Sequence, residues 1–294
     1  MSPAQARGHL AMLAFSALIA GSFSLGALAA PLIAPFALTA VRFVLAAALV
    51  GGAAALGPGI GRAALAAPWR YGVLGLLMAV YFVLMFEGLK TAPPVAAAAV
   101  FTLTPVLSAG FGWLLLRQRL TPRMALALVL GGLGALWVIF RGDLSALLSL
   151  QVGTGEAVYF AGCVAHALYT PMVRRLNRGE PAVVFTFFTM SAGAVLLLLT
   201  GWRDIRATDW AALPAVVWIT LAYISVAASA ASFVLLQFAT LRLPAAKVMA
   251  YTYLVPAWVI GWELALHGTL PPAAALAGLA LTLAALALLL RDEG

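Results

Sequence analysis

Long apolar stretches alternate along the chain with short polar breaks that are rich in glycine, proline and arginine. The stretches cover residues 9–29, 34–56, 69–89, 93–116, 122–140, 154–173, 182–200, 211–237, 244–266 and 272–290. A helix needs about 20 mostly apolar residues to cross the hydrocarbon core of a bilayer. Breaks such as Gly57-Pro58-Gly59 and Pro271-Pro272 are typical of loops. The pattern therefore predicts an all-α integral membrane protein with ten transmembrane helices.

The composition indicates that most of this chain is surrounded by lipid rather than by water. Of its 294 residues, 65% are hydrophobic and 9% are charged, whereas soluble domains are about 45–50% apolar and about 25% charged. Because the spans use nearly the whole length, no stretch remains for a soluble catalytic domain. The sequence contains no His-Glu-x-x-His or Gly-x-Ser-x-Gly motif, and without a Gly-x-x-x-x-Gly-Lys loop it is not expected to hydrolyse ATP. With a single cysteine, Cys163, we expect no disulfide framework, no metal site and no cofactor.

Basic residues are distributed unevenly among the predicted loops. The formal net charge is +8, but the charges lie in short loops and do not gather on one helix face, so we expect a lipid bilayer as partner and no nucleic acid. With the N-terminus inside, eleven basic residues fall on the inner side: Arg7, Arg62, Arg70, Arg117, Arg119, Arg123, Arg174, Arg175, Arg178, Arg242 and Arg291. Four fall on the outer side: Lys90, Arg141, Arg203 and Arg206. The positive-inside rule predicts a multi-pass protein of the cytoplasmic (inner) membrane with both termini in the cytoplasm.

The chain also contains an internal repeat. Residues Tyr81–Met85 resemble Ser232–Leu236, and 151 residues separate Pro105 from Pro256 in the span that follows each segment. Two halves with five predicted spans each follow from this register: residues 1–149 and residues 150–294. Because five is odd, the second half is expected to be inverted in the membrane. Inverted repeats recur in secondary transporters, whose halves move around a midplane site to give alternating access. We therefore predict a transporter of a small-molecule substrate that is a monomer or a homodimer.

Six short segments stand out by their order and spacing. They are Pro35–Ala46, Thr104-Pro105-Val106, Arg119-Leu120-Thr121, Gly155-Glu156, Ala167-Leu168-Tyr169 and Val255-Pro256-Ala257. Together they resemble the EamA-type transporters of the drug/metabolite transporter superfamily, and the likeness covers essentially the whole chain. The resemblance implies export of small amphipathic metabolites, above all amino acids, including aromatic ones.

The chain departs from the pattern of that family at a few positions. Gln118 stands where the family often has Glu, and Gly268 or Thr269 stands at the repeat position. Ala20 and His166 replace a Trp near the end of the first and sixth spans. If that aromatic pair shapes the substrate site in relatives, their specificity does not carry over to this chain.

Arg42 lies unusually deep for an arginine. It is eight residues into the second predicted span, about 12 Å along a helix that rises about 1.5 Å per residue. This is too deep for easy snorkelling to the interface. The side chain could bond carbonyl groups of a neighbouring helix, which is a structural role, or bind the carboxylate of a substrate. Tyr81, in the repeated segment of the third span, is a further candidate for substrate binding.

Lys247 begins a polar and aromatic stripe on the ninth predicted span. At about 100° per residue it shares a helix face with Tyr251 and Trp258. A cation below aromatic rings suits an amphipathic zwitterion, because the ammonium group can pair with the carboxylate. Alternatively, Lys247 snorkels to the inner interface while Trp262, on the same face, joins the outer aromatic belt. Tyr251 and Trp258 lie deeper and fit this second interpretation less well.

Two ionisable residues are candidates for coupling transport to an ion gradient. His166 shares a face of the sixth span with Tyr159 and Cys163. Its imidazole, which titrates near neutral pH when unperturbed, could bind substrate, relay protons or bond a neighbouring helix. Glu263, near the outer end of the ninth span, could titrate, pair with an arginine of another helix or face water.

Pro105 and Pro256 occupy matching interior positions of the fourth and ninth spans. Proline removes a backbone hydrogen bond and favours a kink, so the pair predicts hinges that open opposite gates. Small residues on the fifth and tenth spans suit close packing and predict a scaffold: Ala127, Gly131, Ala135, Ala274, Gly278 and Thr282. We expect a central cavity lined by the first, third, fourth, sixth, eighth and ninth spans.

Two other interpretations remain open. Transport of nucleotide sugars or organophosphates would require several buried cations, and Arg42 with Lys247 is a small supply. A membrane-embedded enzyme would need a catalytic motif or a metal cluster, for which the short loops leave little room.

Overall fold

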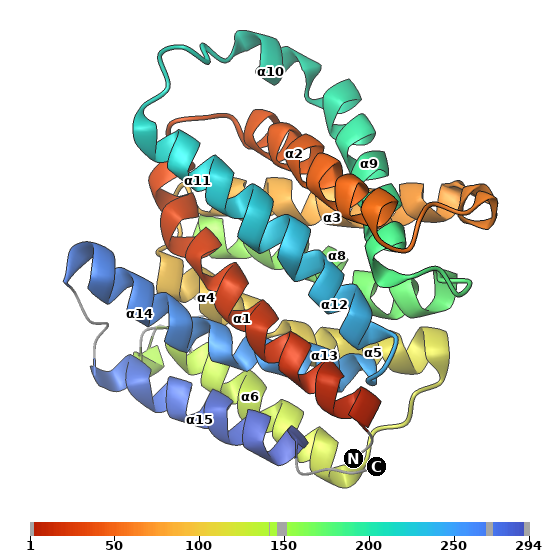
Figure 1. Ribbon diagram of the computed structural model, residues 1–294. Helices are drawn as coiled ribbons and strands as arrows, with labels where there is room; N and C mark the ends of the chain where they lie inside the picture. Colours follow the sequence, from red (N-terminus) through yellow and green to blue (C-terminus); the bar gives the residue numbers. More distant parts are fainter. Residues whose placement is uncertain (1–2, 141, 146–151, 269–272, 291–294) are drawn as a thin grey trace.

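The protein is described by a computed structural model over residues 3–140, 142–145, 152–268 and 273–290 (Figure 1). The helices of the first half are α1 (Pro3–Ala29), α2 (Pro35–Leu56), η1 (Arg62–Leu65), α3 (Trp69–Gly88), α4 (Pro94–Phe101), α5 (Thr104–Leu116) and α6 (Pro122–Ile139). Those of the second half are α8 (Thr154–Leu176), α9 (Ala182–Thr200), α10 (Trp202–Ala207), α11 (Ala215–Ser225), η2 (Val226–Ala231), α12 (Ser232–Thr240), α13 (Ala245–Ala250), η3 (Tyr251–Leu254), α14 (Val255–His267) and α15 (Ala273–Leu290). No strand occurs within the described ranges, which confirms the predicted all-α fold.

Seven of the described helical segments are long and apolar enough to cross a membrane. They are Pro3–Ala29, Pro35–Leu56, Trp69–Gly88, Pro94–Leu116, Pro122–Ile139, Ala182–Thr200 and Ala215–Thr240. Of the other predicted spans, 154–173 lies in α8, which carries polar residues such as His166 and Arg174. Segment 244–266 is divided among α13, η3 and α14, and the last span is described from Ala273 onward. The protein is thus a multi-pass membrane protein, whereas the count of ten spans stays a prediction.

Proline marks the start of several helices. α2, α4 and α6 begin at Pro35, Pro94 and Pro122, where a backbone N–H would lack an intrahelical partner in any case. Thr121 caps α6 by accepting a hydrogen bond at 3.1 Å from a backbone N–H in the first turn. α14 ends at His267 and is followed by Gly268, whose φ of 67° lies in the left-handed region that favours glycine. These boundaries therefore follow from the local sequence.

The connections between helices gather at two ends of the bundle (Figure 1). One end, which we call the basic end, is formed by connections 57–68, 117–121, 177–181 and 241–244, and the start of α1 and the end of α15 lie there too. The opposite end is formed by connections 30–34, 89–93 and 201–214. At the basic end, the Ala245 N–H donates a hydrogen bond to Gln118 Oε1 at 3.3 Å. Five arginines lie in the connections of the basic end: Arg62, Arg117, Arg119, Arg178 and Arg242.

Helices of each half of the chain pack mainly against helices of the other half. α1 packs against α11, α12 and α14, whereas α8 packs against α3, α4 and α5. In addition, α2 lies against α9, α5 against α13, and α6 against α15, a pair that forms one edge of the bundle in Figure 1. Most of these contacts have a counterpart in which the halves are exchanged. Each half therefore supplies packing partners for the helices of the other.

α6 and α15 approach so closely that their contact requires glycine. A Cβ atom added to Gly134 would lie 2.7 Å from the carbonyl oxygen of Gly278, and one added to Gly278 would lie 2.6 Å from that of Gly134. Gly131 instead faces the ring of Tyr253. The two helices thus pack closely, as their small residues predict, but the contact centres on Gly134 rather than on Gly131.

Candidate functional site

Aromatic side chains from both halves of the chain meet in the interior of the bundle. They come from α1, α3, α4, α8 and α12, and neighbouring ring centroids lie 4.5 to 6.4 Å apart. The members of this central aromatic cluster are Phe23, Tyr81, Phe82, Phe101, Tyr159, His166, Tyr169 and Phe233, all of them buried. Helices of the first, third, fourth, sixth and eighth predicted spans therefore meet at one place.

Tyr81 and His166, two of the predicted site residues, lie at the middle of this cluster. The His166 ring centroid lies 4.5 Å from that of Tyr81 and 5.1 Å from that of Phe101. Tyr81 Oη and Tyr159 Oη form a hydrogen bond at 3.0 Å. His166 Nδ1 is buried and has no hydrogen-bond partner. Leaving a buried polar atom unpaired costs about 1–3 kcal/mol, so a bound polar group at this position would stabilise the site.

Close packing of α3 against α8 brings these rings together. Tyr159, His166 and Tyr169 share one face of α8, since they are spaced seven and three residues apart. A Cβ atom on Gly155 would lie 2.4 Å from the carbonyl oxygen of Gly88, so neither helix tolerates a larger residue at this contact. The sequence pattern singled out Tyr159 and His166 as neighbours on a helix face, but gave no sign that rings from α1, α4 and α12 cover that face.

Arg42 lies beside the central aromatic cluster and is completely buried. Its guanidinium group lies 3.6 Å from the ring centroid of Phe82. Nη2 donates a hydrogen bond to the carbonyl oxygen of Ala228 at 2.7 Å, and Nε donates to Ser229 Oγ. These bonds correspond to the structural role considered for Arg42. The remaining nitrogen, Nη1, has no hydrogen-bond partner, so a carboxylate contact stays a prediction.

The groups that Arg42 contacts belong to η2, a π-helical segment between α11 and α12. π-helical turns occur mostly as short insertions in α-helices, often at functional sites. Ser225 and Ser232, at the two ends of η2, each have a buried hydroxyl group without a hydrogen-bond partner. One helix turn further on, Gln237 Nε2 donates to Tyr169 Oη at 2.8 Å. Buried polar groups therefore continue from Arg42 to the central aromatic cluster.

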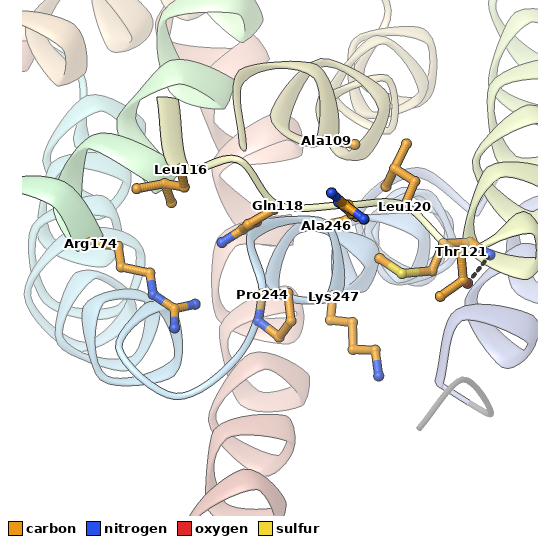
Figure 2. A pocket seen from close by; sticks show the side chains of 11 residues that line it. Ala109, Leu116, Gln118, Leu120, Thr121, Arg174, Pro244, Ala246 and Lys247 are labelled. Carbon is orange, nitrogen blue, oxygen red and sulfur yellow. Dashed lines mark hydrogen bonds between the residues drawn. The ribbon is translucent and has the colours of Figure 1, made fainter. Parts of the chain in front are cut away.

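The stripe of Lys247, Tyr251 and Trp258 contacts other parts of the bundle. Tyr251 Oη and His9 Nδ1 form a hydrogen bond at 3.0 Å, and Trp258 Nε1 donates to Ser16 Oγ at 3.2 Å. His9 and Ser16 both belong to α1, so Tyr251 in η3 and Trp258 in α14 are both bonded to that helix. Lys247 is buried and lines a pocket at the basic end (Figure 2), whereas the Trp258 side chain is 43% exposed. That these three residues bind substrate remains a prediction.

The two predicted hinge prolines each follow a break in a helix. Pro105 is the second residue of α5, and Pro256 is the second residue of α14 after the η3 turn. Thr104 Oγ1 donates to the carbonyl oxygen of Phe101 at 2.7 Å, which replaces the backbone bond that Pro105 cannot donate. Thr104 Oγ1 also lies 3.4 Å from Thr252 Oγ1, so the breaks of the two halves touch each other. The kinks follow from the prolines, and their function as hinges stays a prediction.

Glu263 lies on α14, towards the opposite end, with its side chain 15% exposed. Its Oε2 atom lies 3.4 Å from Nδ1 of His267, one turn further along the same helix, and its Oε1 atom has no hydrogen-bond partner. The neighbour is therefore a histidine of the same helix, which the sequence interpretation did not consider.

A charged contact at the basic end was not anticipated from the sequence. Arg70 Nη2 lies 2.7 Å from Glu180 Oε1, and Arg70 Nη1 donates to the carbonyl oxygen of Leu176 at 2.6 Å. Burial by itself would raise the pKa of Glu180, but hydrogen bonds from Arg70 and from the Arg178 N–H outweigh it and hold that pKa below its ordinary value. This contact joins the start of α3 to the α8–α9 connection. The position of Arg70 in the first turn of a span was the available signal.

No group of three His, Cys, Asp or Glu side chains that could share a metal ion occurs in the part of the chain that the structure describes. The fold defines a multi-pass helical membrane protein. The central aromatic cluster and the buried polar groups beside it are suited to binding a small molecule. The chain belongs to the EamA-like transporter family, whose sequence profile matches residues 6–140 and, a second time, residues 153–291. The resemblance stated from short segments is thereby confirmed.

Two curated relatives bear the names of transporters. The uncharacterized transporter YyaM of Bacillus subtilis is 27% identical over 250 residues, which cover 84% of this chain and 82% of the relative. The aromatic amino acid exporter YddG of Ancylobacter novellus is 31% identical over 188 residues, which cover 63% of each protein. A solved crystal structure with 25% sequence identity superposes with a TM-score of 0.73 over 98% of this chain and 97% of that one.

Proposed function

We propose that this chain is a secondary transporter that exports small amphipathic metabolites, above all amino acids, across the cytoplasmic membrane by alternating access. One observation carries the proposal: groups that suit an amphipathic zwitterion lie together between the two halves. Tyr81 and Phe101 offer aromatic faces beside His166. Buried nitrogen atoms of His166 and Arg42 lack hydrogen-bond partners there. A bound amino acid would satisfy these atoms and pack its side chain on the rings.

In this proposal each group has a separate task. Arg42 Nη1 donates a charge-assisted hydrogen bond to the substrate carboxylate. The rings of Tyr81 and Phe101 contact the apolar side chain and, by cation–π attraction, the ammonium group. His166 binds substrate and takes up or releases the coupling proton, and Glu263 is the second candidate for that proton.

The proposed architecture is ten spans in two inverted five-helix repeats, 1–149 and 150–294, in a monomer or a homodimer. The family profile matches twice, once in each half, and this supports the repeat. The exchange of helix contacts between the halves supports the inversion. The boundary between residues 149 and 150 lies outside the described residues. The basic end faces the cytoplasm, because arginines are retained on that side.

Alternating access requires the two halves to move relative to each other, and the touching breaks offer a pivot. Pro105 and Pro256 each limit the backbone bonding of a helix at its break. Because Thr104 of one break lies against Thr252 of the other, bending of one helix would be transmitted to its counterpart. The proposed transport cycle closes one end while the other opens around this contact.

Transport by purified protein in proteoliposomes tests the function. Labelled phenylalanine, alanine and an uncharged phenylalanine analogue would be supplied with and without a pH gradient. We expect saturable uptake of the amino acids, with phenylalanine preferred and stimulated by the gradient. Tyr81→Leu and His166→Gln should lower phenylalanine transport about tenfold, since the first removes the aromatic face and the second the imidazole, each an interaction worth about 1.4 kcal/mol.

Tyr223→Leu is the matched control for Tyr81→Leu. Tyr223 Oη donates to the carbonyl oxygen of Leu18 at 2.9 Å, and its ring packs against Trp262 outside the central aromatic cluster. Transport should therefore change little in this variant. Uptake of no amino acid, or uptake of labelled organophosphates instead, would contradict the proposed substrate class.

Reporter fusions after Gly294, which lies outside the described residues, test the proposed orientation. An even number of spans returns the C-terminus to the side of the N-terminus, so a cytoplasmic reporter should be active and a periplasmic one inactive. A periplasmic signal would contradict both the count of ten spans and the inverted repeat.

A further inference from the structure

A pocket of about 440 Å³ opens at the basic end, away from the central aromatic cluster (Figure 2). Three basic residues line it: Arg119 from the α5–α6 connection, Arg174 from α8, and Lys247 from α13. The pocket therefore gathers residues from three parts of the chain that are far apart in sequence. We call it the basic pocket.

The wall of the basic pocket is held in place by contacts between its own residues and their neighbours. Gln118 accepts a hydrogen bond from the Ala245 N–H at 3.3 Å, which ties the α5–α6 connection to the start of α13. Thr121 accepts one from the Met124 N–H at 3.1 Å, which caps α6. The arrangement of basic side chains thus rests on a defined backbone rather than on a free loop.

The electrostatics of the basic pocket favour an anion. None of the described residues that line it is acidic. The N-terminus of α6, an 18-residue helix, borders it through Thr121 and Met124 and adds the positive end of a helix dipole. Guanidinium groups match the geometry of phosphate oxygens and bind them with two parallel hydrogen bonds. A phosphate group is therefore the anion that fits best.

Apolar surface adjoins these charges. Leu116 and Leu120 line the basic pocket beside its cations. On α5, which supplies one wall, Trp113 is 56% exposed and Leu114 is 58% exposed. A ligand that fits both regions has a phosphate group and an apolar tail. Basic pockets between transmembrane helices on the cytoplasmic side bind lipid headgroups for the same reason.

We propose that the basic pocket binds the phosphate of an anionic phospholipid headgroup, whose acyl chains lie along the exposed face of α5. The ligand chemistry, a phosphate ester, is shared with soluble organophosphates, which lack the tail. The inference concerns lipid binding and holds whether or not the central aromatic cluster carries a substrate.

Native mass spectrometry of the purified full-length protein tests this site. The protein in detergent micelles would be mixed with phosphatidylglycerol or with phosphatidylcholine of the same acyl chains. We expect preferential retention of phosphatidylglycerol. In Arg119→Gln/Arg174→Gln this retention should fall about 25-fold, since each basic residue near an anionic headgroup contributes about fivefold. Arg117→Gln/Arg178→Gln, which removes two arginines of the same end that do not line the basic pocket, should retain the lipid.

A second variant keeps the test decisive if the double variant fails to fold. Gln118→Glu retains an oxygen that can accept the Ala245 hydrogen bond, and it adds a negative charge to the basic pocket. Lipid retention should fall while thermal unfolding changes little. Equal retention by wild type, Gln118→Glu and the double variant would overturn the proposal.

Soluble phosphates form the remaining arm of the experiment. Glycerol 3-phosphate and inorganic phosphate should neither bind detectably nor displace phosphatidylglycerol, because they lack the apolar tail. Binding of glycerol 3-phosphate, lost in Arg119→Gln/Arg174→Gln and without any preference for the anionic lipid, would overturn the lipid as the source of the phosphate. None of these measurements depends on transport, so failure of the lipid site and failure of the proposed transport function are distinguishable.

Discussion

The two halves of the chain build one pair of corresponding helix contacts in different ways. α3 is α-helical from Trp69 to Gly88. Its counterpart in the second half is the segment formed by α11 and α12, which the π-helical η2 interrupts. The helices that pack against them differ as well. The eighth residue of α2 is Arg42, which bonds η2. The eighth residue of α9 is Thr189, whose hydroxyl group donates to the carbonyl oxygen of Phe185 in its own helix at 2.8 Å.

The contact between α3 and α9 is made by glycines. A Cβ atom on Gly75 of α3 would lie 2.5 Å from the backbone nitrogen of Gly193 in α9. Two regular helices come this close only where side chains are missing. A π-helical turn departs from regular bonding and presents its carbonyl groups to a neighbour, where Arg42 donates to Ala228. One contact therefore depends on close packing and the other on polar bonds.

The largest effect is expected from removing the polar bonds. Arg42→Met should lower the free energy of unfolding by about 3–5 kcal/mol, because the bonds from a buried charged donor are lost and their acceptors stay buried. Thr189→Val, at the matching place in the other half, should cost only about 1 kcal/mol. Denaturant unfolding in detergent micelles measures both values. Equal losses would mean that the two contacts are held in the same way.

Packing at the glycine contact should have the next largest effect. Gly75→Ala should cost about 1–3 kcal/mol, since the added methyl group meets the backbone of α9. Gly72→Ala, one turn earlier on α3, is the control, because a Cβ atom there has no neighbour within 4 Å. It should stabilise the protein by about 0.5–1 kcal/mol through helix propensity. The same unfolding measurement applies, and a stabilising Gly75→Ala would refute the close approach of α3 and α9.

The prolines at the helix breaks should affect transport rather than stability, so they allow the two halves to be compared by their movements. Pro105→Ala and Pro256→Ala should leave folding largely intact but slow transport about fivefold, because restored backbone bonds favour one access state. Cysteine labelling from each side of the membrane would show which state accumulates. We expect the two variants to favour opposite states. Wild-type transport in both variants would reduce the prolines to packing features.

The smallest effect is expected at the basic end, where a charged contact joins the halves. Glu180→Gln should cost about 1 kcal/mol at pH 7, because the amide still accepts a hydrogen bond from Arg70. The lowered pKa of Glu180 gives the wild type extra stability above the ordinary carboxyl pKa, and this stability is lost as the pH falls through the lowered value. The difference between variant and wild type should therefore vanish in acid. A difference that stayed the same from pH 7 down through the acid range would contradict a charged contact.

Much of the helix pattern could be predicted from local sequence. Helices begin at Pro35, Pro94 and Pro122 because proline suits a first turn, and α14 ends directly before Gly268 because glycine tolerates a left-handed backbone. Pro105 predicted a break in the fourth span, and α5 begins there. The η2 turn was not foreseen, since no residue within it forbids an α-helix, and its bonding partner is Arg42 from 186 residues away.

The site was predictable only in part. Helix periodicity placed Tyr159 and His166 on one face, and the structure brings Tyr81 to the same place. The same periodicity grouped Lys247, Tyr251 and Trp258, which the structure distributes over α13, η3 and α14. It could not say that α1 would supply His9 and Ser16 as hydrogen-bond partners of Tyr251 and Trp258.

By itself, the sequence determined the all-helical membrane fold, the family and most helix boundaries, because these depend on apolar length and on the backbone preferences of proline and glycine. Tertiary structure decided which polar groups meet: His166 with Tyr81, Arg42 with η2, and Lys247 with Arg119 and Arg174 at the basic pocket. In an apolar chain, a helix face that lipid covers has the same kind of sequence as a face that another helix covers, because lipid is as apolar as the protein interior. Only the packing of the helices distinguishes the two.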